Sequence, residues 1–255
     1  MELLLRALDN VPEVDQKTNL SSLIIEVSTA NHWIWEDGDI VVIAQKIVSK
    51  SEDRFVNLSD VIPGKRALSY AKHVQKDPRL IELILQESKR VLRTRGGLMI
   101  VQHNLGFICA NAGIDHSNIS IKGRKQEDWV LLLPVDPDLS AKAIQKSLEK
   151  HLMKKIGVLI IDSHGRVWRE GVVGVSIGIS GLPGVVDCRG KRDRNEYELK
   201  ITQIAVADEL AAAASLLMGQ AAEGRPIVIA KGFPYNLRES DLSELIRKES
   251  EDLFR

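Results

Sequence analysis

The sequence predicts an α+β fold with mixed and antiparallel sheets, arranged as two interlocked subdomains. Three observations lead to this prediction. Strand patterns occur both as a hairpin and after helical segments, apolar residues recur at helical spacing between them, and no internal repeat or low-complexity linker interrupts the 255 residues. With 44% hydrophobic residues, the chain can bury one large core or two smaller ones that pack together.

The first elements follow from a turn signal and two helical patterns. Residues 36–39, Glu-Asp-Gly-Asp, precede the apolar run Ile40–Ala44, which is typical of a buried strand. A helix is expected over residues 65–76. Asp77 and Pro78 then start a second helix, which we expect to end at residues 96–97, Gly-Gly.

The middle of the chain alternates strands with a helix. Residues 98–101 and 107–110 are predicted to form a hairpin around a short polar turn. A loop over residues 131–138 precedes a helix from residue 140 to 151, with Ser140 as its N-cap. Residues 157–161 form a short apolar strand that ends at Asp162.

Glycines at 171, 174, 178 and 181 interrupt the next apolar stretch, which indicates a strand with bends and close backbone approaches. An alanine-rich helix over Val206–Met218 is capped by Gly219, and a strand follows at residues 227–230. The highly charged residues 236–255 read as a peripheral helix. We therefore expect one domain over residues 1–235 and a charged extension over residues 236–255.

The composition excludes several classes of function. The 35 basic and 35 acidic residues cancel, so no net field recruits nucleic acid or a membrane surface. The N-terminal apolar stretch is too short for a signal peptide, and no later run reaches the roughly 20 residues that span a bilayer. Cys109 and Cys188 lack the spacing of a zinc site and read as buried apolar residues. A cytoplasmic protein is expected.

Oxygen-bearing side chains stand where predicted strands or helices end. Asp115 follows one strand, Asp162 follows another, and Gln220 lies just past the helix closed by Gly219; Ser163 could add a hydroxyl oxygen. Side chains at such ends converge on loops, where hard divalent cations find oxygen ligands. The alternative is that each aspartate only forms a turn or a cap.

Two basic clusters are candidates for binding an anion. Lys46 and Lys50 follow the strand Ile40–Ala44, and residues 189–192 hold two arginines and a lysine around Gly190. Solvated charge is the alternative for each, and no Walker A sequence is present. His116 and His164 follow aspartates but lack a partner at ligand spacing, so neither receives a role.

The ordered motifs resemble those of the coenzyme F420-0:L-glutamate ligase family, also called F420:gamma-glutamyl ligases. They recur in the family's order from about residue 7 to 233. The motifs cover residues 36–39, 45–50, 111–118, 133–134, 162–166, 171–174, 177–181, 190–193, 207–210 and 216–220.

The resemblance implies a homodimer that uses GTP and Mg²⁺ or Mn²⁺ to add L-glutamate to F420-0, and it leaves open whether K⁺ is also needed. The implied metal ligands are Asp115, Asp162, Ser163 and Gln220. The implied catalytic residues are Asp115, Asp162 and Lys50. The implied nucleotide-binding residues are Asp9, Asn10, Val11, Pro12, Gln45, Lys46, Lys50, Asn118, Met218, Gly219, Gln220, Ala221, Ala222, Glu223, Gly224 and Arg225.

Two departures from the family pattern bear on the metal. Ser163 stands where archaeal members carry threonine, which keeps the hydroxyl, and Gln220 stands where they carry glutamate, which replaces a charged ligand by a neutral one. Three alternatives stay open: a gamma-glutamyl ligase for another acceptor such as a folate, a nucleotide- and metal-binding protein without catalysis, and a glycine-rich centre that is only a dimer interface.

Overall fold

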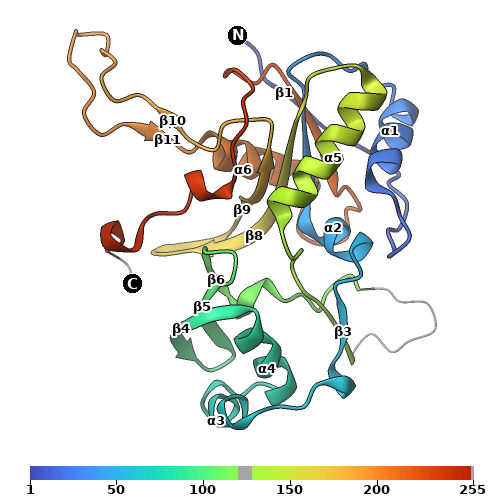
Figure 1. Ribbon diagram of the computed structural model, residues 1–255, viewed down its shortest axis with the longest axis vertical. Helices are drawn as coiled ribbons and strands as arrows, with labels where there is room; N and C mark the ends of the chain where they lie inside the picture. The colour runs from blue at the N-terminus through green and yellow to red at the C-terminus, as the bar shows by residue number, and fades with distance from the viewer. Residues whose placement is uncertain (120–127, 254–255) are drawn as a thin grey trace.

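The computed structural model describes residues 1–119 and 128–253 and confirms the α+β class (Figure 1). A five-stranded sheet with helices on both faces forms the larger part of the molecule, and smaller sheets of two and three strands lie beside it. The helices are α1 (Leu20–Ala30), α2 (Gln45–Ser51), α3 (Lys65–Val74), α4 (Pro78–Gln86), α5 (Pro137–Leu152) and α6 (Val206–Met218), with short 3-10 turns η1 (Leu58–Asp60), η2 (Asn111–Gly113), η4 (Leu242–Glu244) and η5 (Glu249–Glu251).

The large sheet is mixed, as predicted, because β2 (Ile40–Ala44) and β8 (Gly157–Arg166) run parallel while its other neighbouring pairs are antiparallel. Ile40 pairs with Gly157 and Ala44 with Ile161, so Asp162 lies just beyond the point where β2 ends. In spatial order the strands are β1 (Leu4–Ala7), β12 (Ile227–Lys231), β2 (Ile40–Ala44), β8 (Gly157–Arg166) and β9 (Arg169–Ser180).

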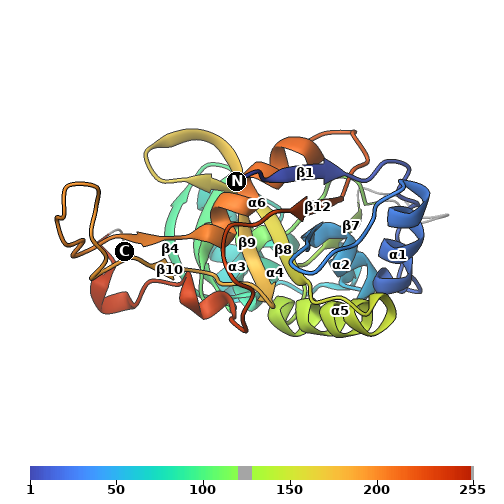
Figure 2. The same ribbon diagram turned by 90° about the horizontal axis from the view of Figure 1, so that it is seen from above.

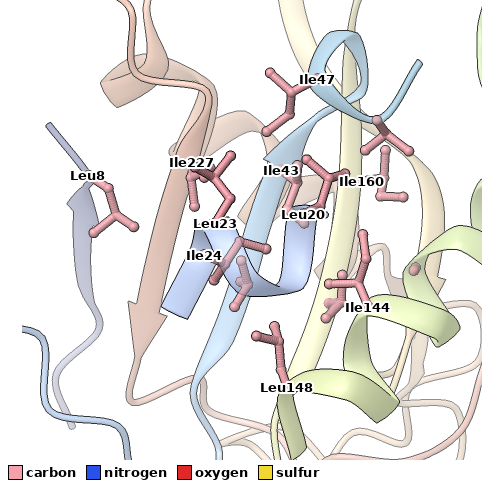
Figure 3. Close-up of a cluster of buried hydrophobic side chains, with 14 of the residues drawn as sticks. Leu8, Leu20, Leu23, Ile24, Ile43, Ile47, Ile144, Leu148, Ile160 and Ile227 are labelled. Atoms are coloured by element: carbon pink, nitrogen blue, oxygen red, sulfur yellow. The ribbon is translucent and has the colours of Figure 1, made fainter. Parts of the chain in front are cut away.

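β2 is continuously apolar because helices cover both faces of the sheet. Val41 and Ile43 pack with α1 and α5, whereas Ile40 and Val42 pack with α6, which is the two-residue period of a strand. Figure 2 shows α5 and α6 on opposite sides of β8 and β9. Figure 3 shows the core on the side of the sheet that α1 and α5 cover. Its labelled residues are Leu8, Leu20, Leu23, Ile24, Ile43, Ile47, Ile144, Leu148, Ile160 and Ile227.

The helix α5 begins earlier than predicted, at Pro137. Its N-cap is Asp136 and not Ser140: the Asp136 carboxylate accepts from the backbone N–H of Leu139 at 2.9 Å. Proline is favoured in a first helical turn, because the N–H it lacks would have no partner inside the helix. The Ser140 hydroxyl instead bonds the backbone carbonyl of Asp136 at 3.0 Å and the Glu52 carboxylate.

The segment after α4 is a strand and not the end of a helix. β4 (Ser88–Arg95) pairs antiparallel with β5 (Leu98–His103), so Gly96 and Gly97 form the turn between two strands. β4 lacks an apolar alternation because it is the edge strand, where charged side chains prevent further pairing. The predicted hairpin of β5 with β6 (Ile108–Ala110) is confirmed.

The strand β8 continues past its predicted end and forms a long hairpin with β9. Asp162 therefore lies inside a strand and not at its terminus. The predicted close approaches occur at two glycines of β9. A Cβ on Gly174 would lie 2.5 Å from the Ala211 carbonyl oxygen, and one on Gly178 would lie 2.5 Å from that of Pro137, so these glycines let α6 and α5 approach the sheet.

Three further pairings were not predicted. β1 adds an edge to the large sheet, β3 (Phe55–Asn57) pairs with β7 (Trp129–Leu131), and β10 (Val186–Asp187) pairs with β11 (Gln203–Ile204). Residues 186–204 form an arm that extends away from the large sheet (Figure 1). These strands are short, so they carry too little periodicity for detection.

The prediction of a helix over the charged residues 236–255 is wrong for residues 236–253, and residues 254 and 255 lie outside the part that the structure describes. The tail contains only the turns η4 and η5. Its best-anchored residue is Leu242, which is 5% exposed and donates its backbone N–H to the Asp138 carboxylate at 3.0 Å. Within residues 1–119 and 128–253, no helix is both long and apolar enough to cross a membrane.

Candidate active site

A cavity of about 720 Å³ lies where β2 ends and α2 begins, next to Asp162 of β8. Parallel neighbours bring the ends of their strands together, which explains why segments far apart in the chain meet there. Of the residues predicted from the sequence, the cavity is lined by Val11, Pro12, Gln45, Lys46, Lys50, Asp115, Asn118, Asp162, Ser163, Met218, Gly219, Gln220, Ala221, Ala222, Glu223, Gly224 and Arg225.

Among the implied nucleotide-binding residues, Asp9 and Asn10 do not line the cavity. Asp9 nevertheless contacts its rim, because its carboxylate pairs with the Arg225 guanidinium at 2.8 Å. Asn10 adopts a left-handed backbone conformation with φ 58°. The N-terminal segment is thus joined to the 218–225 loop by an ion pair, while Val11 and Pro12 reach the cavity itself.

Asp115 is held in place by its backbone and its side chain. Its N–H and C=O both bond Leu131 at 2.9 Å, which fixes the chain after the left-handed turn η2. The Gln45 amide donates to its Oδ2 at 2.9 Å, and the Lys46 ammonium lies 3.5 Å from the same oxygen. Two residues at the start of α2 therefore fix one oxygen of this carboxylate.

Burial raises the pKa of Asp115, the Lys46 ammonium lowers it, and the nearby Asp162 carboxylate raises it. The ionised form is therefore disfavoured by lost solvation and by the like charge of Asp162. A bound cation would relieve both effects, because it stabilises two neighbouring carboxylates at once.

Asp162 and Ser163 are adjacent on β8 and face opposite sides of the strand. Asp162 Oδ2 lies 3.0 Å from His164 Nε2, while the Ser163 hydroxyl donates to the Gln220 amide oxygen at 2.8 Å. The structure thus brings Gln220, which follows α6, to the side of β8 where Ser163 lies.

The oxygen atoms of the cavity side chains suit a hard divalent cation that binds together with a phosphate group. Across the described residues, no group of three or more histidines, cysteines or acids could hold a metal by itself. The cavity does offer carboxylates from Asp115 and Asp162 and neutral oxygens from Ser163 and Gln220. Mg²⁺ sites commonly combine one or two carboxylates with substrate phosphates and water, so this set suits such a cation.

Lys46 and Lys50 lie one turn apart on α2 and both line the cavity. Lys46 donates to the backbone oxygen of Ser117 at 3.0 Å. The Lys50 side chain is 7% exposed and pairs with the Glu13 carboxylate at 3.2 Å. Two ammonium groups therefore line the same cavity as Asp115 and Asp162, and such groups commonly bind phosphate oxygens.

The second basic cluster lies outside this cavity. Arg189, Lys191 and Arg192 belong to the arm, where Arg189 pairs with Asp187 at 2.5 Å and Arg192 pairs with Glu196 at 3.0 Å. The hypothesis that these residues hold the anionic acceptor stays a prediction, since they do not line this cavity. Carboxylates two to four residues away already neutralise both arginines.

Two contacts of the cavity residues were not predicted from the sequence. Glu13 was not singled out, and its link to Lys50 spans segments that only the fold brings together. His164 was left without a role, although its spacing of two from Asp162 on one strand places both side chains on the same face.

The cavity gathers two carboxylates, two neutral oxygens and two lysines, which is a set of polar groups typical of an enzyme site. The model of the F420-0:Gamma-glutamyl ligase family matches residues 9–232, so the chain belongs to this family. It is 41% identical to a protein of Methanocaldococcus jannaschii named coenzyme F420:L-glutamate ligase, over 94% of this chain and 91% of that protein.

Two further relatives carry the same name. The Methanothermobacter thermautotrophicus protein is 40% identical over the whole of both chains. The Methanococcus maripaludis protein is 43% identical over 86% of each chain. The similarity therefore extends over the cavity and over the arm alike.

Proposed function

We propose that this chain ligates L-glutamate to coenzyme F420-0 with consumption of GTP and with Mg²⁺ or Mn²⁺ as cofactor. Family membership supports the ligase class and the acceptor. The single observation that carries the chemistry is the convergence of Asp115, Asp162, Lys46 and Lys50 on one cavity, because these groups suit a phosphate chain and a divalent cation.

The reaction needs activation of a carboxylate, since its oxygen is a poor leaving group. In the proposed route, a carboxylate oxygen of the acceptor attacks the γ-phosphorus of GTP, giving an acyl phosphate and GDP. The amine of L-glutamate then attacks the acyl carbon, an amide forms, and inorganic phosphate leaves with the bonding electrons. The proton lost by the amine passes to solvent or phosphate.

The roles of the chain's residues follow from their contacts. Lys46 and Lys50 bind phosphate oxygens and offset charge that develops during transfer. Asp115, Asp162, Ser163 and Gln220 would hold one or two divalent cations, which would supply electrostatic stabilisation of the transferring phosphoryl group. Asn118 donates to the Ala221 backbone oxygen at 3.1 Å, so it positions the 218–225 loop over the nucleotide.

The direct test incubates the purified protein with GTP, Mn²⁺, L-glutamate and F420-0, with and without K⁺, and follows products by mass spectrometry. Glutamylated F420 is expected, with one GDP released for each amide bond formed. Intact GTP with no new amide would overturn the proposal. Replacing F420-0 by a folate in a parallel reaction identifies the acceptor, and GTP binding without GDP release with either acceptor would favour a non-catalytic protein.

We also propose that the protein is a homodimer, as the family resemblance implies. Light scattering after size-exclusion chromatography measures the mass directly. A mass close to twice the 28.4 kDa of one chain supports this state, and a monomer mass at assay concentration contradicts it.

A further inference from the structure

The carboxylate of Asp162 has a neighbour that holds its orientation. His164 Nε2 lies 3.0 Å from Asp162 Oδ2, and the two side chains are 12% and 15% exposed. Because the carboxylate accepts, the imidazole donates through Nε2–H. Both residues belong to β8 and are two apart, so the strand's own period directs them to one face.

The His164 ring is itself restrained by a column of aromatic rings. Phe107 packs against His164 with ring centroids 5.3 Å apart, and His103 stacks on Phe107 at 5.2 Å with an interplanar angle of 9°. His103 is 2% exposed, and its Nδ1 accepts from the Leu105 N–H at 3.0 Å. The hairpin of β5 and β6 thus fixes one side of the ring that contacts Asp162.

We propose that His164 is a positioning residue for the metal site: by engaging Asp162 Oδ2 it fixes the carboxylate and leaves Oδ1 to bind the divalent cation. This inference rests on the proposed function. Partners behind a metal-binding group commonly change metal affinity or activity by roughly 10- to 100-fold when they are removed. His164 therefore acts through Asp162 and not on the substrates.

Two substitutions separate a hydrogen bond from packing. His164→Leu fills space beside Phe107 but cannot donate to Asp162. In His164→Gln, the side-chain amide nitrogen reaches about as far from the backbone as Nε2 and can donate in its place. His116→Leu is the matched control, because His116 also neighbours a proposed metal carboxylate but is exposed and lies outside the cavity lining.

The measurement is the affinity for GTP by titration calorimetry, once with Mn²⁺ and once with EDTA, in the absence of acceptor. Mn²⁺ should increase the GTP affinity of the unaltered protein, and this increase should be roughly 10- to 100-fold smaller in His164→Leu. The GTP affinity measured with EDTA should be the same in both proteins. His164→Gln should retain most of the increase with Mn²⁺, and His116→Leu should retain all of it. The Mn²⁺ dependence of turnover should shift in the same order.

An undiminished Mn²⁺ gain in His164→Leu, or an equal loss in His164→Gln, would overturn the positioning role. If His164→Leu fails to fold, His164→Asn replaces it, because its amide is too short to reach Asp162. If the unaltered protein makes product but Mn²⁺ does not increase its affinity for GTP, this inference alone is overturned. An unaltered protein that makes no product overturns the proposed function.

Discussion

The start of α2 and the arm of residues 186–204 carry similar basic residues but place them in different surroundings. Lys46 and Lys50 lie on α2, directly after a central strand of the large sheet, and both reach the cavity. Arg189 and Arg192 lie on the arm, whose strands pair with each other, and local carboxylates neutralise them. Both regions pair their cations with carboxylates, but only Lys46 and Lys50 line a cavity that could hold an anionic ligand.

The two regions also differ in how tightly their backbone is enclosed. Gly113, next to the cavity, has φ +65°, and a Cβ there would lie 2.7 Å from Leu133 Cδ1. Gly190, in the arm, has φ +80° but would meet no atom within 4 Å. Both positions need a left-handed conformation, but only the site position is also enclosed by packing.

The largest expected effect is on activity at Asp115. Asp115→Asn should reduce kcat by on the order of 100- to 1,000-fold, because the amide keeps the shape but loses the charge that holds a cation. Asp187→Asn in the arm is the matched control and should change kcat by less than about twofold. Steady-state assays measure both, with thermal unfolding as a check on folding. Full turnover by Asp115→Asn would remove that residue from the site.

The glycine pair provides a test of stability. Gly113→Ala should lower the free energy of unfolding by roughly 2–5 kcal/mol, the sum of backbone strain and overpacking against Leu133. Gly190→Ala should lose about 1–2 kcal/mol, because only the backbone strain applies. Urea denaturation at neutral pH measures both values. Equal losses at the two positions would contradict the difference in enclosure.

Replacing the buried Lys50 should weaken GTP binding by less than the loss of activity at Asp115 and by more than any change in the arm. Lys50→Met should raise the Kd for GTP by roughly 10- to 100-fold, because a charge-assisted hydrogen bond to phosphate is lost. Its present partner Glu13 has a side chain that is 84% exposed, so water can solvate that carboxylate after the change. Lys142→Met, on the solvent-facing side of α5, serves as the control. GTP binding equal to that of the unaltered protein would show that Lys50 is structural.

The smallest effect is expected in the arm. Simultaneous replacement of Arg189, Lys191 and Arg192 by alanine should change kcat/KM for F420-0 by less than about twofold, since these residues lie outside the cavity of their own chain. Initial rates over a range of F420-0 concentrations provide the measurement. A tenfold rise in KM would break the comparison and indicate that the arm reaches the site of another copy.

Much of the fold could be predicted because strong local patterns coincide with the main elements. β2, α6 and the hairpin of β5 and β6 are long or apolar enough to stand out. β4 is predicted as part of a helix because an edge strand exposes its charged residues. The predicted start of α5 is too late because Asp136, and not Ser140, is the N-cap. These errors arise where tertiary context decides between two local signals.

The candidate site was less accessible to local reasoning. Asp115 and Asp162 stand 47 residues apart in sequence, and spacing alone leaves each of them a turn former. The ordered family motifs brought them together, and the cavity places them side by side. The contact of Glu13 with Lys50 joins segments 37 residues apart, which no local pattern encodes. The contact of His164 with Asp162 follows from strand periodicity only once β8 is known to continue past Asp162.

The tail described above has a mechanical consequence. Leu242 is tied to Asp138 near β9, while Glu249 pairs with Arg90 of β4 at 2.7 Å and Ile246 lies against Gly106. One extended segment therefore straps the large sheet to the three-stranded sheet. A protease that cut between Leu242 and Glu249 would therefore remove one link between the two sheets, while the packing of Phe107 against His164 would still join them.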